Sequence, residues 1–206
     1  MFLQSDSTII SGWISFGGAL LGALMGGLFA FLATVYSLKK SQTNNLAIQE
    51  QSNRATIRGV LLGIKTEIEA NVKGYIEETK EFWATYSEGK PFLFIYDVTQ
   101  NYFIVFDSNA YILGQIEDDD LRESIIVAYL NAKGLIDSHL LQNKKIREFE
   151  KFSLEHLERG HPTAEVNRIN ADILQTSRSL KYAFDQTKSS VDILLKKINS
   201  SNLILK

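Results

Sequence analysis

The histidines and their neighbouring carboxylates are the residues whose types and spacing would support acid–base or metal chemistry. His156 and His161 lie with Glu155 and Glu158 in the one segment where two histidines and two glutamates cluster in the sequence. That segment straddles a Gly-His-Pro turn at 160–162 and lacks the ligand spacing of known zinc sites. We therefore interpret it as a solvated connection rather than as a metal site.

The third histidine and an acidic triplet also favour structural interpretations. His139 falls on an apolar helical stripe, which predicts a hydrogen-bonded core histidine rather than a catalytic one. Asp118, Asp119 and Asp120 precede that stripe, and acidic residues at a helix start complement the helix dipole. Because consecutive carboxylates point in different directions around a helix, the triplet favours a helix N-terminus over a divalent-cation site.

The common catalytic motifs are missing from the sequence. It contains no Walker loop, no HExxH, no GxSxG and no kinase or nuclease pattern in the required context. It also contains no cysteine, which excludes disulfides, thiolate catalysis and cysteine metal sites. We predict that the protein is not an enzyme and that it uses no metal or cofactor.

One short segment concentrates positive charge and suggests a site for an anionic ligand. Its members are Lys144, Lys145, Arg147 and Lys151, interrupted by Glu148 and Glu150. They form either a solvated helix face or a site for a nucleotide or short oligonucleotide, whose phosphates Lys and Arg would bind. The aromatic residues between Phe92 and Tyr111 either stack on bases or form core. The formal net charge of −2 argues against a general electrostatic grip on nucleic acid.

The elements that must position these residues are mostly helices, within one domain at 39–206. Three apolar stripes at helical spacing predict them. They are Ile57, Leu61, Ile64, Ile68, Val72 and Ile76; then Leu121, Ile125, Tyr129, Ala132, Ile136, Leu140 and Ile146; then Val166, Ile169, Ile173, Leu180, Phe184, Thr187, Val191, Leu194 and Ile198. The last stripe is a near-heptad seam, long enough to pair with a helix of a neighbouring subunit.

The first of these helices runs from Ser41 to about Tyr86, because no proline interrupts that segment. Beyond Gly89 and Pro91, the short aromatic runs 92–96 and 102–106 predict either a small β-hairpin or a packed loop. The expected fold class is therefore mainly α: one N-terminal transmembrane helix and a cytoplasmic bundle of long helices, with a small aromatic hairpin as an option.

The N-terminal segment, 1–38, contains the transmembrane helix at about 9–37. No charged residue occurs from Ser7 to Leu38, and a helix of that length at ~1.5 Å per residue crosses the ~30 Å hydrocarbon core once. A cleavable signal peptide is the alternative, but the segment before the run has no Lys or Arg and the run is too long. We expect a single span.

Flanking residues predict how this helix is oriented. Trp13 and Tyr36 lie near its two ends, as interfacial anchors do, and Lys39, Lys40 and Arg54 follow it. This places the N-terminus outside and the domain 39–206 in the cytoplasm, with the span in a bacterial inner membrane.

Small residues gather on one half of the span in two parallel ridges. Gly18, Gly22 and Gly26 form a GxxxGxxxG glycine zipper; Ser15, Ala19, Ala23 and Gly27 form the second ridge. Helix association in lipid relies on close backbone approach, so these ridges predict a contact surface. Two ridges favour two neighbours per helix and hence a homo-oligomer of more than two copies.

A ring of such helices either encloses a pore or forms a closed bundle. No ionisable residue occurs in the span, so a pore would be weakly selective and would close by dewetting. A closed bundle would merely hold the cytoplasmic domain at the membrane.

The order of features resembles that of a group of small bacterial membrane proteins. The segments that carry the likeness follow the glycine-rich span: LLGIKTEIEANVKGYIEE, then YFIVFDSNAYILGQIEDDDLRESIIVAYLNAKGLIDS. Several proteins of this architecture are membrane effectors of antiphage systems, and the Hailong-type channel effector is the nearest named example. The resemblance implies an oligomeric channel held in check by a nucleic-acid signal, with a separately encoded regulator. It carries over no functional residue.

The sequence thus predicts an oligomeric inner-membrane effector, a gated pore or ion channel that disrupts the membrane in antiphage defence. The cytoplasmic domain would assemble the oligomer and sense a signal. The alternative is a membrane-tethered helical scaffold that binds a protein partner.

Overall fold

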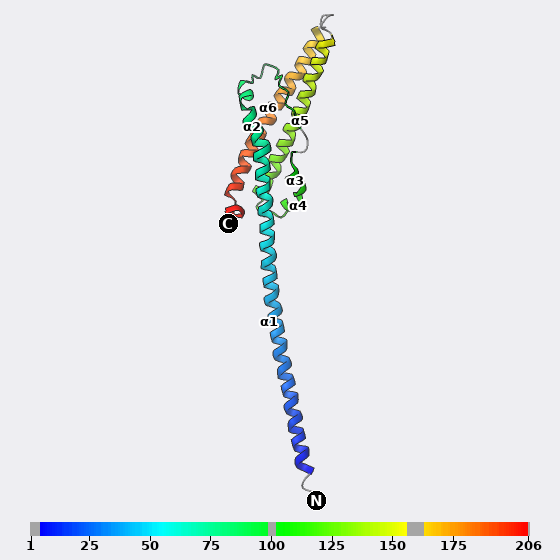
Figure 1. Ribbon diagram of the computed structural model, residues 1–206, viewed down its shortest axis with the longest axis vertical. Coiled ribbons are helices and arrows are strands. Elements are labelled where there is room, and N and C mark those ends of the chain that lie inside the picture. Colours follow the sequence, from blue (N-terminus) through cyan, green and yellow to red (C-terminus); the bar gives the residue numbers. More distant parts are fainter. Residues whose placement is uncertain (1–4, 99–101, 156–162, 206) are drawn as a thin grey trace. The chain divides into compact units, whose positions relative to one another are not determined.

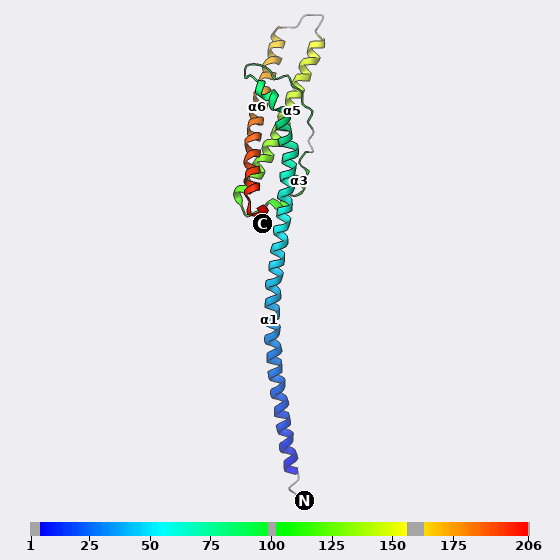
Figure 2. The ribbon, with the colours of Figure 1, turned by 60° about the vertical axis from the view of Figure 1, so that its left-hand side comes forward.

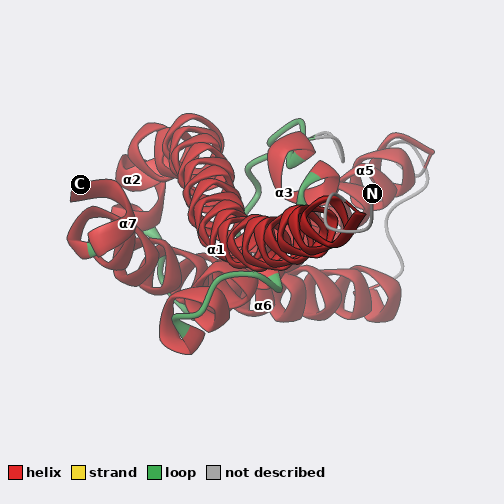
Figure 3. Ribbon diagram, turned by 90° about the horizontal axis from the view of Figure 1, so that it is seen from below, coloured by secondary structure: helices red, strands yellow, loops and turns green. Residues whose placement is uncertain are grey.

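The chain is mainly helical in the computed structural model, which describes residues 5–98, 102–155 and 163–205 (Figure 3). No strand occurs among these residues. The elements are α1 (Ser5–Glu67), the π-helix η1 (Ile68–Lys73), α2 (Gly74–Thr85), α3 (Ile104–Ser108), α4 (Ala110–Leu113), α5 (Asp119–Glu155), α6 (Thr163–Ser200) and α7 (Asn202–Leu205). The helical path that the sequence predicts from Ser41 to about Tyr86 is confirmed, with one π-turn inside it.

The chain divides into two units, Met1–Asn53 and Arg54–Lys206. The first unit contains most of α1, which is long and apolar enough near the N-terminus to cross a membrane. The second unit contains a packed core. The division falls within α1, and it lies farther along the chain than the boundary at residue 38 that hydropathy suggested.

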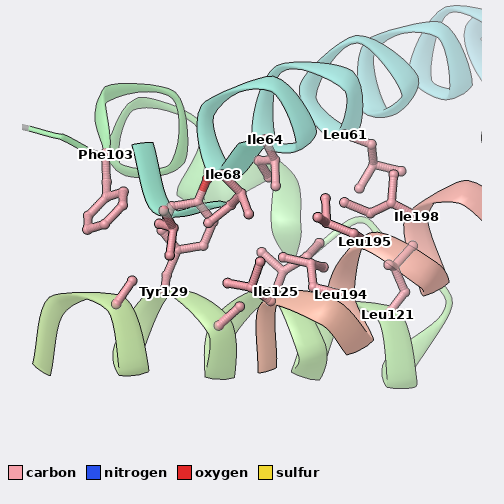
Figure 4. Packing of buried hydrophobic residues seen from close by; sticks show 14 of the residues in the cluster. Leu61, Ile64, Ile68, Phe103, Leu121, Ile125, Tyr129, Leu194, Leu195 and Ile198 are labelled. Carbon is pink, nitrogen blue, oxygen red and sulfur yellow. The ribbon is translucent and has the colours of Figure 1, made fainter. Parts of the chain in front are cut away.

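The core of the second unit is built by the end of α1 together with α5 and α6, which run side by side (Figures 1 and 2). Figure 4 shows Leu61 and Ile64 of α1 facing Ile125 of α5 and Leu194 of α6. All four side chains have no solvent exposure. The stripe from Ile57 to Ile76 is buried throughout, as its spacing predicts.

The π-helix η1 has a cause that is visible in that stripe. Ile64, Ile68, Val72 and Ile76 follow one another at intervals of four, and four residues of α-helix turn by ~400°, so each step drifts ~40° around the axis. A π-turn takes more residues per turn and absorbs the drift. It therefore keeps Ile68, Val72 and Ile76 on the buried face.

The buried carboxylate of Glu67 attaches α3 to the end of α1. It accepts hydrogen bonds from the backbone N–H of Val105 at 2.7 Å and of Phe106 at 3.2 Å, and from the Tyr129 hydroxyl at 2.7 Å. The first N–H groups of a helix have no partner within the helix. The Glu67 carboxylate, at the end of α1, is the acceptor for these α3 N–H groups. The Tyr129 hydroxyl of α5 donates a third hydrogen bond to the same carboxylate.

Neither half of the expected hairpin forms a strand among the described residues. The segment 92–96 has no regular secondary structure, and the segment 102–106 enters α3 at Ile104. The packed-loop alternative describes the first half: Phe92, Phe94, Ile95 and Tyr96 are half-buried, and only Leu93 between them is exposed.

This loop is held by side chains of α5 and α6 in place of a neighbouring strand. The Asn143 side chain accepts from the Tyr96 N–H at 3.3 Å and donates to the Tyr96 carbonyl at 2.7 Å. The Ser177 hydroxyl accepts from the Phe92 N–H, and the Gln142 amide donates to the Phe92 carbonyl at 2.5 Å. Backbone groups that a sheet would pair are thus satisfied by three side chains.

Two details of the predicted stripes need correction. On α5, Leu140 is exposed and Ile136 only half-buried, because the buried face passes through Leu135, His139 and Asn143. On α6 the seam is buried from Ile169 onward, but α5 of the same chain covers it. That face of α6 is therefore buried within the chain and is not available to a helix of a neighbouring subunit.

Candidate functional site

The apolar face of the N-terminal helix is the largest uncovered apolar surface among the described residues. From Trp13 to Tyr36 every described large apolar side chain is exposed, with exposed fractions between 47% and 71%. Uncovered apolar surface on this scale is a feature of segments that contact lipid or another protein. This is the helix that is long and apolar enough to cross a membrane.

The small residues of this helix have no explanation within the chain. A Cβ atom added at Gly18, Gly22, Gly26 or Gly27 would meet no other atom within 4 Å, helix backbone and chain neighbours apart. Glycine in a helix interior costs roughly 0.5–1 kcal/mol relative to alanine. The ridges, including Ser15, Ala19 and Ala23, are exposed along their length. Within the described parts of the chain, no other element covers these ridges.

The second candidate is a cavity of about 330 Å³ inside the second unit. The π-helix η1 and the start of α2 form one wall, α5 forms another, and residues of the loop before α3 complete it. Its polar lining groups are Asn71, Tyr75, Glu78, Tyr96, Tyr102 and His139. Of these, the sequence pointed to His139 and, within the aromatic run from Phe92 to Tyr111, to Tyr96 and Tyr102. Asn71 and Tyr75 lie four residues apart on the helical path through η1 into α2, and that spacing is the signal that could have found them.

His139 is the buried end of a hydrogen-bonded pair in this cavity wall. The side chain is 1% exposed, and its Nε2 lies 2.5 Å from the Tyr75 hydroxyl. Burial lowers the pKa of His139 to about 4, so the imidazole is neutral at pH 7. The core role predicted for this histidine is confirmed, and its Nδ1 has no hydrogen-bond partner among the described residues.

The two tyrosines nearest His139 are also neutral and lie at an angle to each other. Burial raises the pKa of Tyr75 to about 12. Burial and the hydrogen bond from its hydroxyl to Glu78, at 3.1 Å, raise the pKa of Tyr96 to about 12. The two rings lie 5.0 Å apart with an interplanar angle of 75°. The one acidic side chain of the described lining is the exposed Glu78.

Three of the four predicted basic residues lie together around a shallow hollow. Lys144, Arg147 and Lys151 line it with Asp97 and Glu148. Lys145 points elsewhere and pairs with Asp172 at 3.7 Å as well as with Glu148 at 3.0 Å. Two carboxylates at the rim offset much of the positive charge there, with Arg147 3.5 Å from Asp97. An anionic ligand at this hollow stays a prediction.

The remaining polar clusters are structural or fall outside the described residues. The Asp118 side chain accepts from the Leu121 N–H at 2.9 Å and caps α5, and Asp119 pairs with Arg122. No cluster of His, Asp and Glu able to hold a metal ion occurs in the described parts of the chain. The group of His156, His161, Glu155 and Glu158 lies outside the residues whose side chains the structure describes.

The aromatic residues between Phe92 and Tyr111 mostly pack against the core. Phe92 stacks on Trp83 with ring centroids 4.6 Å apart, and Phe106 stacks on Tyr129 at 4.0 Å. These faces are therefore occupied within the chain and not open to bases.

No family model, curated protein or solved structure matches this chain.

Proposed function

We propose that the protein is a single-span membrane protein whose N-terminal helices associate through their small-residue ridges into a homo-oligomeric pore. The observation that carries this is the set of exposed glycines on α1, where an added Cβ would meet no atom within 4 Å other than the helix's own backbone and the chain neighbours. Because glycine weakens a helix, the three glycines at four-residue spacing, Gly18, Gly22 and Gly26, need a compensating interaction, and close backbone packing between copies supplies it.

The rest of the proposal follows from charge and from the resemblance. The basic residues Lys39 and Lys40 after the span support a cytoplasmic location of the second unit in a bacterial cell. The packed unit 54–206 would then regulate a pore in the inner membrane. The likeness in layout to antiphage membrane effectors supports a role in disrupting the membrane during defence.

The decisive experiment records conductance of the purified full-length protein in planar bilayers and measures oligomer size in the same preparation. Gly22→Leu places a bulky side chain in the centre of the glycine ridge, and we expect it to abolish both the oligomer and the current. Gly17→Leu is the matched control. Gly17 also has open space around an added Cβ, but it lies off both ridges on a wheel of ~100° per residue.

Each outcome separates the candidate functions. Currents in the wild type and in Gly17→Leu, with none in Gly22→Leu, support the pore. An oligomer that stays intact in Gly22→Leu refutes the packing surface. An oligomer that depends on Gly22 but carries no current, even when the second unit is removed from each copy by proteolysis, favours the membrane-tethered scaffold.

A further inference from the structure

We propose that the cavity between η1, α2 and α5 binds a small organic cation, an ammonium compound with a compact apolar body. This inference concerns the second unit alone and does not rest on the proposed pore. It comes from the size of the cavity, from the aromatic character of its wall and from the sign of its charge.

Four of the fourteen described lining residues of the cavity are Tyr or Phe. Tyr75, Tyr96, Tyr102 and Phe103 line it, and Val72 and Leu135 are among its aliphatic members. Tyr75 and Tyr96 meet at 75°, so they present differently oriented surfaces. Rings arranged around a space attract a cation through their quadrupoles, and ammonium groups bind in such aromatic cages.

The charge of the wall selects against anions. None of the described lining residues is Lys or Arg, and His139 is buried and uncharged at pH 7. Glu78 contributes a carboxylate at the mouth, where Oε2 accepts from the Tyr96 hydroxyl. A cation entering the cavity would meet this carboxylate first and then the rings.

The size of the cavity fits a molecule rather than an ion or a few waters. Its volume of about 330 Å³ lies at the lower end of the range typical of small-molecule sites, ~300–1,000 Å³. Three of the lining residues, Ala70, Asn71 and Val72, belong to the π-helix η1. Asn71 is held in place by donating to the Tyr102 carbonyl at 2.6 Å.

The test is titration calorimetry on the full-length protein in a non-ionic detergent, with detergent alone as the blank. The probes are choline, benzyltrimethylammonium and 3,3-dimethylbutan-1-ol, the last being the uncharged analogue of choline. We expect at least one of the two cations to bind and the alcohol to bind about tenfold more weakly or not at all.

Two pairs of variants assign the binding to this cavity. Glu78→Gln removes the charge but keeps an acceptor for Tyr96, and we expect about fivefold weaker cation binding. Glu77→Gln is its control, because Glu77 is exposed, pairs with Lys80 at 3.0 Å and does not line the cavity. Tyr96→Leu removes a ring and weakens binding, whereas Tyr96→Phe keeps the ring and retains most of it.

Thermal denaturation of each variant without probe separates loss of binding from loss of fold. Cation binding that falls in Glu78→Gln and Tyr96→Leu at unchanged melting temperature supports the proposal. No binding of either cation at millimolar concentration overturns it. So does equal binding of the alcohol, or binding that Glu78→Gln and Glu77→Gln affect alike.

Discussion

Burial of His139 predicts that the second unit loses stability in mild acid. The imidazole has a pKa of about 4 in the folded unit, against the ordinary 6.5 of an unfolded chain. Between pH ~6.5 and pH ~4 this imidazole is therefore protonated in the unfolded chain but neutral in the folded unit. The free energy of unfolding falls as pH falls through this range. The stabilising effect is fully present above pH ~6.5 and is lost progressively down to pH ~4.

The size of this effect follows from proton linkage. With these two pKa values, the free energy of unfolding drops by about 2 kcal/mol between pH ~8 and pH ~5 from this one group. That is a large part of the ~5–15 kcal/mol that stabilises a typical domain. Carboxylates also titrate in this range, so the contribution of His139 must be isolated by comparison with a variant.

The variant is His139→Gln, which is neutral at every pH and still offers Tyr75 a hydrogen-bond partner. We expect it to flatten the pH dependence of stability by about 2 kcal/mol over that interval. Urea unfolding of the full-length protein measures this through the fluorescence of Trp83, which is 6% exposed. A Trp13→Phe background leaves Trp83 as the sole tryptophan reporter.

A control with both other histidines changed, His156→Gln with His161→Gln, should keep the wild-type pH dependence, since the sequence assigns them to a solvated connection. A wild-type slope in His139→Gln would refute the reasoning, because the acid sensitivity would then belong to other groups.

Two further predictions concern the buried polar groups that hold the loop and α3. Glu67→Ala leaves two α3 N–H groups and the Tyr129 hydroxyl without their acceptor. At ~1–3 kcal/mol for each unsatisfied group, the free energy of unfolding measured in urea should fall by about 3 kcal/mol or more. A fall under ~1 kcal/mol would show that water replaces the carboxylate. Asn143→Leu removes both partners of the Tyr96 backbone, and hydrogen exchange should quicken at the Tyr96 amide while the core of α6 near Leu180 stays protected.

The sequence alone predicts long helices well. The stripe from Ile57 to Ile76, the α6 seam and the Asp118 cap were all predictable, because helix geometry repeats regularly and its signals are local. The uncharged run from Ser7 to Leu38 identified the membrane-length helix, because its length and composition are also local properties of the sequence. One feature of the cavity was also predicted, namely His139 as a core residue.

Tertiary structure alone decided the features that join distant segments. The aromatic run at 92–96 has the composition of a strand, but Asn143 and Ser177 satisfy its backbone, so it remains a loop. The cavity lies where η1, α2, α5 and the segment before α3 come together, and no local pattern encodes that approach. Sequence periodicity determines which face of a helix is apolar; which element covers that face, and what space is left between them, depends on side-chain packing across the chain.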